Sequence, residues 1–417
     1  NKQWSELLEP AIKLAINGFM VSPRLANAVR RDQDKLSKDI ASKNYFLPKG
    51  KPIQVGQNLI NVDYANTLNA LAKHGGDHFY QSSISKAIVE KVQKSNNPGY
   101  LDQNDFNQYK LIERAATCSE YRQYNVCGMG PPSSGAISVG QTLGILESFE
   151  LTKLSPASPL AWQLIAEASR LAFADRGKYI ADPDFINLPT GLLSTSYLRK
   201  RAQLITPNKA ALTVQAGNPE AKTAALYKAA RSPEQASTSH FVIVDAEGNI
   251  VSMTSTVENG FGSRLMVNGF LLNNELTDFS FEPRKNGVLV ANSVQAGKRP
   301  RSSMAPTIVF KDSAPFLALG SPGGSRIINY VSNTLIGVLD WNLSLQDAFD
   351  MPHIVNRFGK MDVEANTTAT QHIDTFKSMG YEVTARDLNS GLHGVLFTNE
   401  GMVGAADKRR EGIVLGR

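Results

Sequence analysis

The chain has 417 residues, of which 42% are hydrophobic and 20% charged, an ordinary balance for a globular protein. Its net charge of +6 comes from 44 basic and 38 acidic residues, and the basic residues are dispersed, so we expect no nucleic-acid-binding surface. No run of 18 apolar residues occurs, so no segment is expected to span a membrane.

Two cysteines, Cys118 and Cys127, flank a predicted hairpin over residues 121–126. They could pair in an oxidising compartment or remain two thiols, and the spacing alone leaves both alternatives open. The six histidines are scattered and form no ligand pattern with the cysteines. We therefore expect neither a metal nor another cofactor.

The first half of the chain predicts mainly helices, because apolar residues recur at helical spacing and Gly or Pro follows each stretch. A strand is expected at 110–112, and the helix that begins at Pro159 should end before Gly177. The predicted helices cover residues 1–20, 63–73, 83–94, 136–151 and 159–175.

Segment 200–237 is polar and poorly periodic, which predicts a surface connection with a helix-like stretch at 219–235. After it the pattern changes to period 2, which indicates strands. Strands are expected at 240–245, 250–256, 269–273, 306–311, 315–320, 382–385 and 393–398, with helices at 325–339, 345–350 and 369–379. The order of elements predicts a layered α/β fold with mixed sheets.

Thr238 stands at the entrance to the first of these strands. Four clusters of carboxylates, hydroxyls and glycines follow it, and such groups can hold a zwitterionic substrate and stabilise an oxyanion. They are Glu258-Asn259-Gly260-Phe261-Gly262, Asn273 to Ser280, Lys298 to Met304, and Gly320 to Arg326.

These clusters, in this order and spacing, resemble the γ-glutamyltransferases (glutathione hydrolases) of the N-terminal nucleophile hydrolase superfamily. The resemblance also includes Leu8 to Ala15, Pro131-Pro132-Ser133-Ser134-Gly135, Ala174-Asp175-Arg176 and Asp182 to Phe185. It implies an α/β fold built as a four-layer αββα sandwich. It also implies a large subunit over 1–237 and a small subunit over 238–417, interwoven in one domain.

Thr238 is the predicted nucleophile. Cleavage of the Ser237–Thr238 peptide bond would free the threonine α-amine, a group that is partly unprotonated near neutral pH and can accept the hydroxyl proton. The competing interpretation is an ordinary strand threonine. His240, two residues along the same strand, is expected to be structural.

The resemblance implies roles for the other site residues. Thr256 would orient the nucleophile, and the backbone amides of Gly323 and Gly324, which precede a predicted helix, suit an oxyanion hole. The substrate would be held by Glu275 and Asp278 at its α-ammonium and by Ser302 and Ser303 at its α-carboxylate, while Glu258 stands where many relatives have a substrate-binding asparagine.

The expected donor is glutathione or a related γ-glutamyl amide, and the expected acceptor is water, an amino acid or a peptide. The family's large subunit begins well before the position that matches Asn1, so an amino-terminal part with a substrate-binding arginine is expected upstream. Members are commonly exported, which implies a periplasmic or extracellular location.

Two alternatives remain. One is a related acylase that acts on glutaryl-type amides or poly-γ-glutamate. The other is an unprocessed, inactive homologue with a binding role.

Overall fold

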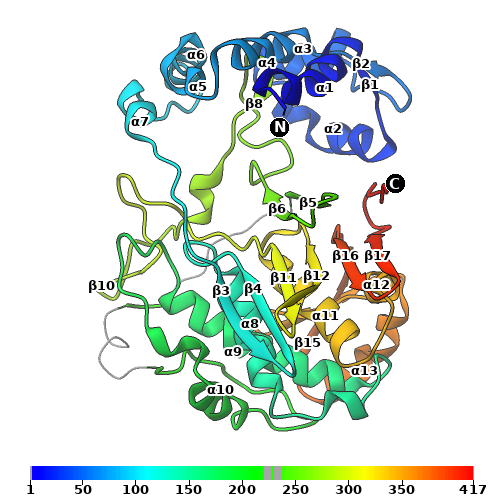
Figure 1. The fold of residues 1–417 in the computed structure, drawn as a ribbon. Helices are drawn as coiled ribbons and strands as arrows, with labels where there is room; N and C mark the ends of the chain where they lie inside the picture. The colour runs from blue at the N-terminus through cyan, green and yellow to red at the C-terminus, as the bar shows by residue number, and fades with distance from the viewer. Residues whose placement is uncertain (1, 220–226, 230–236, 417) are drawn as a thin grey trace. The chain divides into compact units, whose positions relative to one another are not determined.

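A computed structural model of the chain describes residues 2–219, 227–229 and 237–416. The chain forms two compact units, which can be followed in Figure 1. The first comprises residues 1–113 and 257–274, and the second comprises residues 114–256 and 275–417. Each unit thus contains segments from both sides of Thr238. The predicted division into a large subunit (1–237) and a small subunit (238–417) refers to cleavage of the chain, and it stays a prediction. Among the described residues, no helix combines the length and apolar character that crossing a bilayer requires.

The first unit is mostly helical, and polar residues cap its helices. The Ser22 hydroxyl accepts a hydrogen bond from the Leu25 amide (3.1 Å), and Pro23 occupies the first helical position, where no amide hydrogen is needed. The elements are α1 (Trp4–Asn17), β1 (Phe19–Met20), α2 (Pro23–Leu36), α3 (Ile40–Phe46), η1 (Pro48–Gly50), β2 (Asn58–Leu59), α4 (Val62–His74), α5 (His78–Gln81), α6 (Ser83–Gln93), α7 (Gln103–Gln108), β7 (Met266–Val267) and β8 (Phe270–Leu271).

A small hydrophobic core holds the late segment 257–274 against these helices. Phe261 packs edge to face on Phe46, with ring centroids 5.2 Å apart, and Met266 is buried in the same cluster as Val29 and Leu36. Residues more than 200 positions apart in sequence therefore form one packed unit.

The second unit is built on a six-stranded sheet in the order β17-β16-β12-β11-β4-β3, with every neighbouring pair antiparallel. Leu317 and Leu319 of β12 lie in a core shared with Leu143 of α8 and Leu335 of α11, so these helices cover one face of the sheet (Figure 1). The strands are β3 (Thr117–Tyr121), β4 (Tyr124–Gly128), β11 (Thr307–Lys311), β12 (Ala314–Gly320), β16 (His393–Thr398) and β17 (Gly401–Ala406), and the long helices are α8 (Gly135–Leu146), α9 (Pro159–Tyr179) and α11 (Ile327–Leu339).

The hairpin of β5 (Ser239–Val244) and β6 (Ile250–Ser255) packs on the opposite face of this sheet. A Cβ placed on Gly320 of β12 would lie 2.3 Å from the His240 ring, and the Ser252 hydroxyl donates to the Leu319 carbonyl (3.1 Å). Because neighbouring residues of a strand face opposite sides, Gly320 points away from the helices that Leu319 contacts. The layers of this unit therefore run helix, sheet, hairpin.

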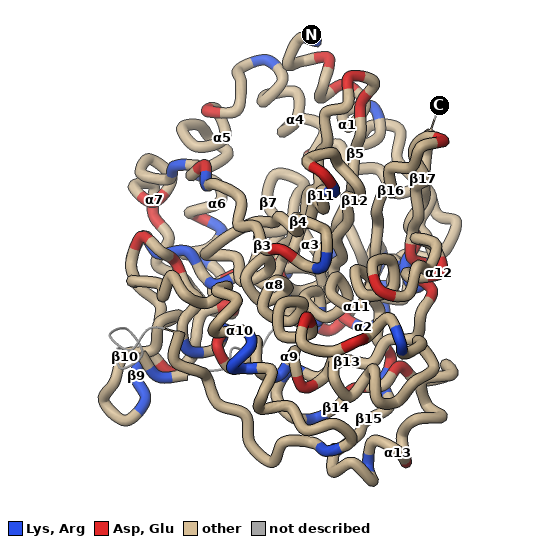
Figure 2. Tube along the Cα trace, turned by 60° about the horizontal axis from the view of Figure 1, so that its bottom comes forward, with Lys and Arg blue, Asp and Glu red and all other residues tan. Residues whose placement is uncertain are grey.

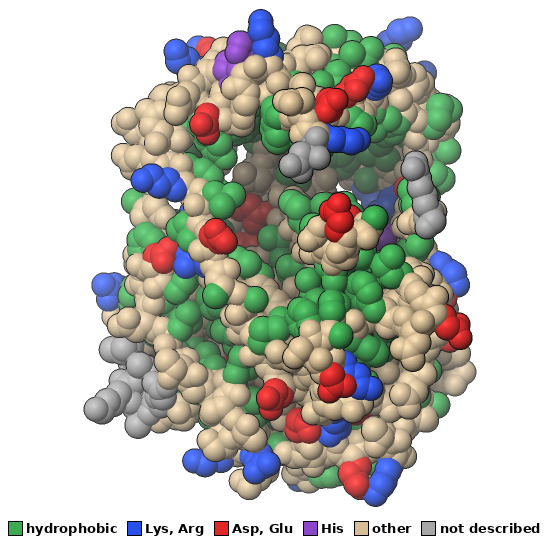
Figure 3. Space-filling view, in the orientation of Figure 1, with side chains coloured by type: hydrophobic (Ala, Val, Ile, Leu, Met, Phe, Trp, Pro, Cys, Tyr) green, Lys and Arg blue, Asp and Glu red, His purple; other side chains and the backbone are tan. Residues whose placement is uncertain are grey.

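The remaining elements of the second unit include a three-stranded sheet in which β14 and β15 run parallel. Figure 2 shows basic and acidic residues interspersed along the chain, and Figure 3 shows their side chains mixed on the face that it displays. The elements are η2 (Leu151–Lys153), η3 (Thr190–Leu193), α10 (Thr195–Ala202), η4 (Glu275–Asp278), β9 (Arg284–Lys285), β10 (Val288–Leu289), η5 (Gly324–Arg326), α12 (Leu345–Asp350), β13 (Ile354–Asn356), β14 (Lys360–Glu364), η6 (Thr368–His372), α13 (Ile373–Ser378) and β15 (Glu382–Arg386).

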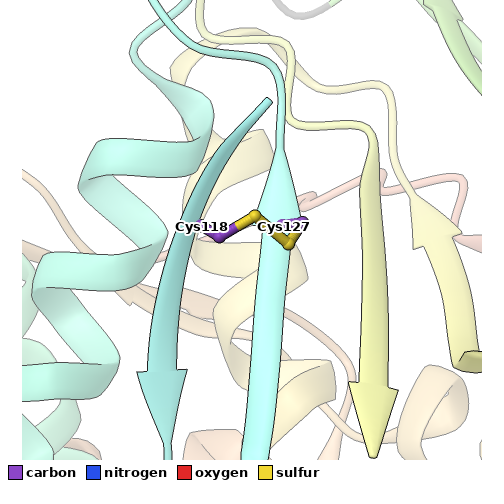
Figure 4. The surroundings of a disulfide bond; sticks show 2 residues. All are labelled: Cys118 and Cys127. Carbon is purple, nitrogen blue, oxygen red and sulfur yellow. A yellow bond between two sulfur atoms is a disulfide. The ribbon is translucent and has the colours of Figure 1, made fainter. Parts of the chain in front are cut away.

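The predicted hairpin between the two cysteines is confirmed as β3–β4. Cys118 and Cys127 are directly opposite each other in the antiparallel register and form a disulfide, which bridges the two strands in Figure 4. Of the two alternatives left by the sequence, the structure contains the bonded pair.

Two local predictions are wrong. Residues 110–112 form no strand, and Leu111 is 84% exposed, so the apolar pair Leu111-Ile112 is not part of the sheet. Helix α9 continues past Gly177 to Tyr179, because its end is buried in the core and tertiary packing outweighs the glycine's low helix propensity. In the predicted connection 200–237, residues 220–226 and 230–236 lie outside the described residues, and with them most of the helix-like stretch 219–235.

Candidate functional site

Thr238 and Thr256 face each other at the open end of the β5–β6 hairpin. The strand register pairs Ser239 with Ser255, so the next residues outward are Thr238 and Thr256. Their side-chain oxygens lie 3.2 Å apart, within hydrogen-bond reach. The structure therefore brings the predicted nucleophile and its predicted partner together.

The backbone of Thr238 is held in an unfavourable conformation. Its φ is +136°, a region that a β-branched residue rarely occupies. Arg410 donates from Nη1 to the Thr238 carbonyl (3.0 Å) and from Nε and Nη2 to the Asn389 carbonyl (3.3 and 3.2 Å). Such conformations persist only when the surroundings fix them, and Arg410 is one of the groups that does so.

Gly323 and Gly324 form the turn between β12 and α11, with φ values of +137° and +62°. A Cβ on Gly323 would lie 2.6 Å from the Tyr330 ring, so only glycine fits there. The turn is linked to Thr238 through Gly391 and Arg410. A Cβ on Gly391 would lie 2.7 Å from the side chain of Pro322, the residue before the turn, and 2.7 Å from the side chain of Arg410, which bonds to the Thr238 carbonyl.

The carboxylates of Glu275 and Asp278 belong to one turn of 3₁₀ helix, η4, and the Oε1 atom of Glu275 is buried. Asn292 connects this turn with the serine pair. Its Nδ2 donates to the Asp278 carbonyl (2.7 Å), and its Oδ1 accepts from the Arg301 amide (3.0 Å), one residue before Ser302. The predicted ammonium-binding and carboxylate-binding groups are thus joined through one buried amide.

Ser302 and Ser303 lie at the same end of the sheet as the glycine turn. They precede β11, whose first residue Thr307 pairs with Leu319 near the end of β12. Ser303 is 7% exposed, and the Ser302 amide donates to the Pro132 carbonyl (3.1 Å). Because His240 packs on Gly320, the hairpin with Thr238 lies at this end of the sheet too.

Glu258 belongs to the first unit. It is 4% exposed, has a φ of +71°, and accepts a hydrogen bond from the Asn274 side chain. The other predicted site residues belong to the second unit, so the contact of Glu258 with a substrate stays a prediction.

His240 is placed as a structural residue. Its Nδ1 lies 2.8 Å from the Thr254 hydroxyl, and burial between the hairpin and the sheet, with a smaller contribution from His393, lowers its pKa to about 3. A neutral, buried imidazole that bonds to Thr254 rather than Thr238 is not in position to act as the base.

We expect the burial of His240 to weaken the fold in acid. Below about pH 6.5 the unfolded chain binds a proton that the folded chain excludes, so this contribution is full above pH 6.5 and is lost as the pH falls towards 3. Between pH 6.5 and 3, His240→Asn should reduce the slope of the free energy of unfolding against pH by about 1.4 kcal/mol per pH unit. Urea unfolding at pH 7, 6, 5 and 4 measures both slopes, and equal slopes would contradict the prediction.

Two further residues were not found from the sequence. Asn292 and Arg410 act through contacts with residues distant in sequence, and neither stands in a local motif. Asn292 stands between Ala291 and Ser293, and Arg410 ends the basic run Lys408-Arg409-Arg410, and neither pattern points to a functional role.

The site combines a threonine with strained backbone at the start of a strand, a second hydroxyl beside it, and a glycine turn at the same end of a helix-covered sheet. This is the arrangement expected for an N-terminal nucleophile hydrolase. A model of one family, gamma-glutamyltranspeptidase, matches residues 1–416. The chain belongs to this family.

The relatives include hydrolases and an acylase. The chain is 35% identical to the glutathione hydrolase proenzyme of Bacillus subtilis (strain 168) over 426 residues, which cover 100% of the chain and 71% of the relative. It is 38% identical to the glutathione hydrolase proenzyme of Bacillus subtilis subsp. natto, and the alignment covers 84% of the chain and 59% of the relative. It is 32% identical to the acylase ACY 1 proenzyme of Pseudomonas sp. (strain SE83), and the alignment covers 98% of the chain and 70% of the relative. The chain thus spans 59% to 71% of these proteins.

The fold is shared with a cephalosporin acylase of Bacillus halodurans, whose crystal structure aligns with a TM-score of 0.86 at 24% identity. The alignment covers 100% of the chain and 74% of that structure. The mixed α/β fold of the N-terminal nucleophile hydrolase type, predicted as an αββα sandwich, is confirmed.

Proposed function

We propose that the protein cleaves itself before Thr238 and then hydrolyses or transfers the γ-glutamyl group of glutathione and related amides. The observation that carries the proposal is the strained Thr238, whose hydroxyl lies 3.2 Å from that of Thr256. The family membership and the relatives named as proenzymes support the same interpretation.

Self-cleavage would begin when the Thr238 hydroxyl oxygen attacks the carbonyl carbon of Ser237. The peptide C–N bond breaks, the acyl group moves from nitrogen to oxygen, and water hydrolyses the resulting ester. The products are a carboxylate at Ser237 and a Thr238 with a free hydroxyl and a free α-amine. Leaving the conformation with φ of +136° would release strain of order 1–3 kcal/mol, which favours the cleaved product.

In turnover, the Thr238 hydroxyl would attack the γ-carbonyl carbon of the donor while its proton passes to the α-amine. The Gly323 and Gly324 amides would stabilise the oxyanion, and Thr256 would orient the nucleophile. The leaving amine departs with the proton and leaves a γ-glutamyl ester on Thr238. Water then releases glutamate, whereas an amino acid or peptide acceptor forms a new γ-glutamyl amide.

Residues 1–237 and 238–417 would remain associated as the two subunits of one precursor. Both segments contribute to each compact unit, which supports continued association after the cut. The Cys118–Cys127 disulfide fits a periplasmic or extracellular location, where such bonds persist.

A donor pair tests the substrate assignment. γ-Glutamyl-p-nitroanilide and glutaryl-p-nitroanilide differ only in the α-ammonium, which Glu275 and Asp278 would bind. We expect the γ-glutamyl compound to have the higher kcat/KM, and Asp278→Asn to reduce that preference about 10- to 100-fold, because a charged hydrogen bond contributes about 1.5–3 kcal/mol. The matched control is Glu282→Gln, an exposed carboxylate in the same segment, which should keep the wild-type preference.

The second candidate is an amide acylase of the glutaryl type. The 32% identity to an acylase proenzyme over nearly the whole chain favours it. Equal or higher kcat/KM with the glutaryl donor would contradict the γ-glutamyl assignment and support this alternative.

A further inference from the structure

Ser302 and Ser303 rest on the turn that begins α8. The Ser134 amide donates to the Ser302 carbonyl (2.8 Å), and Ser133 and Ser302 form a parallel β-bridge. A Cβ on Gly135 would lie 2.4 Å from the Met304 carbonyl oxygen, so the two segments approach as closely as backbones can. The backbone of the serine pair therefore packs directly against the backbone of residues 133–135.

Arg176 of α9 is the side chain behind this contact. It is 1% exposed, and its guanidinium donates from Nε to the Ser134 hydroxyl (2.8 Å) and from Nη2 to the Ser303 hydroxyl (2.6 Å). The backbone carbonyl of Arg176 accepts from Nη1 of Arg301 (3.0 Å), the residue before Ser302. Arg176 thus contacts the hydroxyls of Ser134 and Ser303 and is tied to the segment before β11 that carries the predicted carboxylate-binding pair.

The direction of these hydrogen bonds follows from chemistry. A guanidinium only donates, so the Ser303 oxygen must accept from it, and the Ser303 hydroxyl hydrogen must point elsewhere. The Ser134 hydroxyl also accepts from Arg176, and it donates its own hydrogen to the Ser302 carbonyl (2.7 Å). The planar guanidinium of Arg176 therefore directs the Ser303 hydroxyl hydrogen away from Arg176.

We infer that Arg176 is a positioning residue that holds the Ser303 hydroxyl ready to donate to the α-carboxylate of the donor substrate. The inference rests on the proposed function, because it assigns a supporting residue to the same substrate site. Arg176 acts through Ser303 and need not touch the substrate. Its loss should therefore impair recognition of the carboxylate more than the chemical step at Thr238.

The test uses two donors that differ at this group: γ-glutamyl-p-nitroanilide and its α-carboxamide. We expect Arg176→Gln to raise KM for the carboxylate donor about 10- to 100-fold, the size of one charged hydrogen bond, with a smaller change in kcat. KM for the carboxamide donor should change little. In a Ser303→Ala background, Arg176→Gln should have little further effect, since the hydroxyl that it orients is gone.

Arg176→Lys is the conservative control, because it keeps the charge and one donor but not the fork, and its KM should lie between wild type and Arg176→Gln. If Arg176→Gln does not fold in thermal denaturation, Ser134→Ala replaces it. That change loosens the guanidinium from the other side and should raise KM for the carboxylate donor alone, about 2- to 10-fold.

Four outcomes would overturn the assignment. Equal losses on both donors, or undiminished losses in the Ser303→Ala background, would show that Arg176 only supports the fold. An unchanged KM in a folded Arg176→Gln protein would show that it has no part in carboxylate recognition. A cleaved wild-type protein that turns over neither γ-glutamyl donor would overturn the proposed function, and this assignment with it.

Discussion

Thr238→Ala is expected to leave the chain as one uncut species and to abolish turnover. The hydroxyl is proposed as the attacking group in both self-cleavage and catalysis, and alanine keeps the backbone but removes that oxygen. Losing a nucleophile costs on the order of 10⁴-fold or more in rate. Intact mass under denaturing conditions measures cleavage directly, because the wild-type chain of 417 residues should give fragments of 237 and 180 residues.

Two variants control for local disturbance. Thr238→Ser keeps a hydroxyl and should still be cut, and Ser239→Ala changes the exposed neighbour on β5 and should be cut and active. A Thr238→Ala protein that still separates into the same two fragments would remove Thr238 from the mechanism. A wild-type protein that stays in one piece would favour the inactive, binding homologue.

Gly323→Ala should reduce kcat by about 10²- to 10³-fold, the cost of losing one oxyanion-hole donor. A methyl group there would lie 2.6 Å from the buried Tyr330 ring, and the φ of +137° is unfavourable for alanine. Because the turn has to move to relieve both conflicts, the amides of Gly323 and Gly324 should lose their alignment. Steady-state kinetics on γ-glutamyl-p-nitroanilide, together with intact mass, would separate the loss of turnover from the loss of cleavage.

Gly401→Ala is the matched control for backbone strain. Gly401 has a similar φ of +128° but lies at the exposed β16–β17 turn, where a Cβ would meet nothing within 4 Å. We expect it to cost stability of order 1–3 kcal/mol and to leave kcat unchanged. If both variants lost kcat equally, the effect of Gly323→Ala would come from strain rather than from the oxyanion site.

Periodicity predicted the elements whose two faces differ in burial. The hairpin 239–255, strands β11 and β12, and helices α11 and α12 lie close to the predicted ranges. Helices α2 and α3 were missed although signals for both were readable. Ala26, Val29 and Leu36 form one buried face of α2, and Ser22 and Asp39 cap the two helices. Strands β13, β14 and β17 were missed because their packing depends on the whole unit.

The site was predictable where chemistry and spacing act within one short segment. Thr238 and Thr256 follow from a single hairpin, and Gly323 and Gly324 from a strand-to-helix turn. Arg176, Asn292 and Arg410 contribute through partners at least nine residues away, up to 172 for Arg410 and Thr238. Spacing along the chain contains no information on such pairs, and Arg176 stood in a recognised motif to which no role was assigned.

The hydrogen bond from Arg410 to the Thr238 carbonyl also has a consequence for the order of events during biosynthesis. Thr238 leaves the ribosome well before Arg410, which is made 172 residues later. Until the segment that contains Arg410 has been synthesised and has folded onto the hairpin, the peptide bond proposed for cleavage lacks one of the contacts that hold it. The contact would therefore delay the cut until Arg410 is in place, so that chains interrupted between Thr238 and Arg410 would stay uncut.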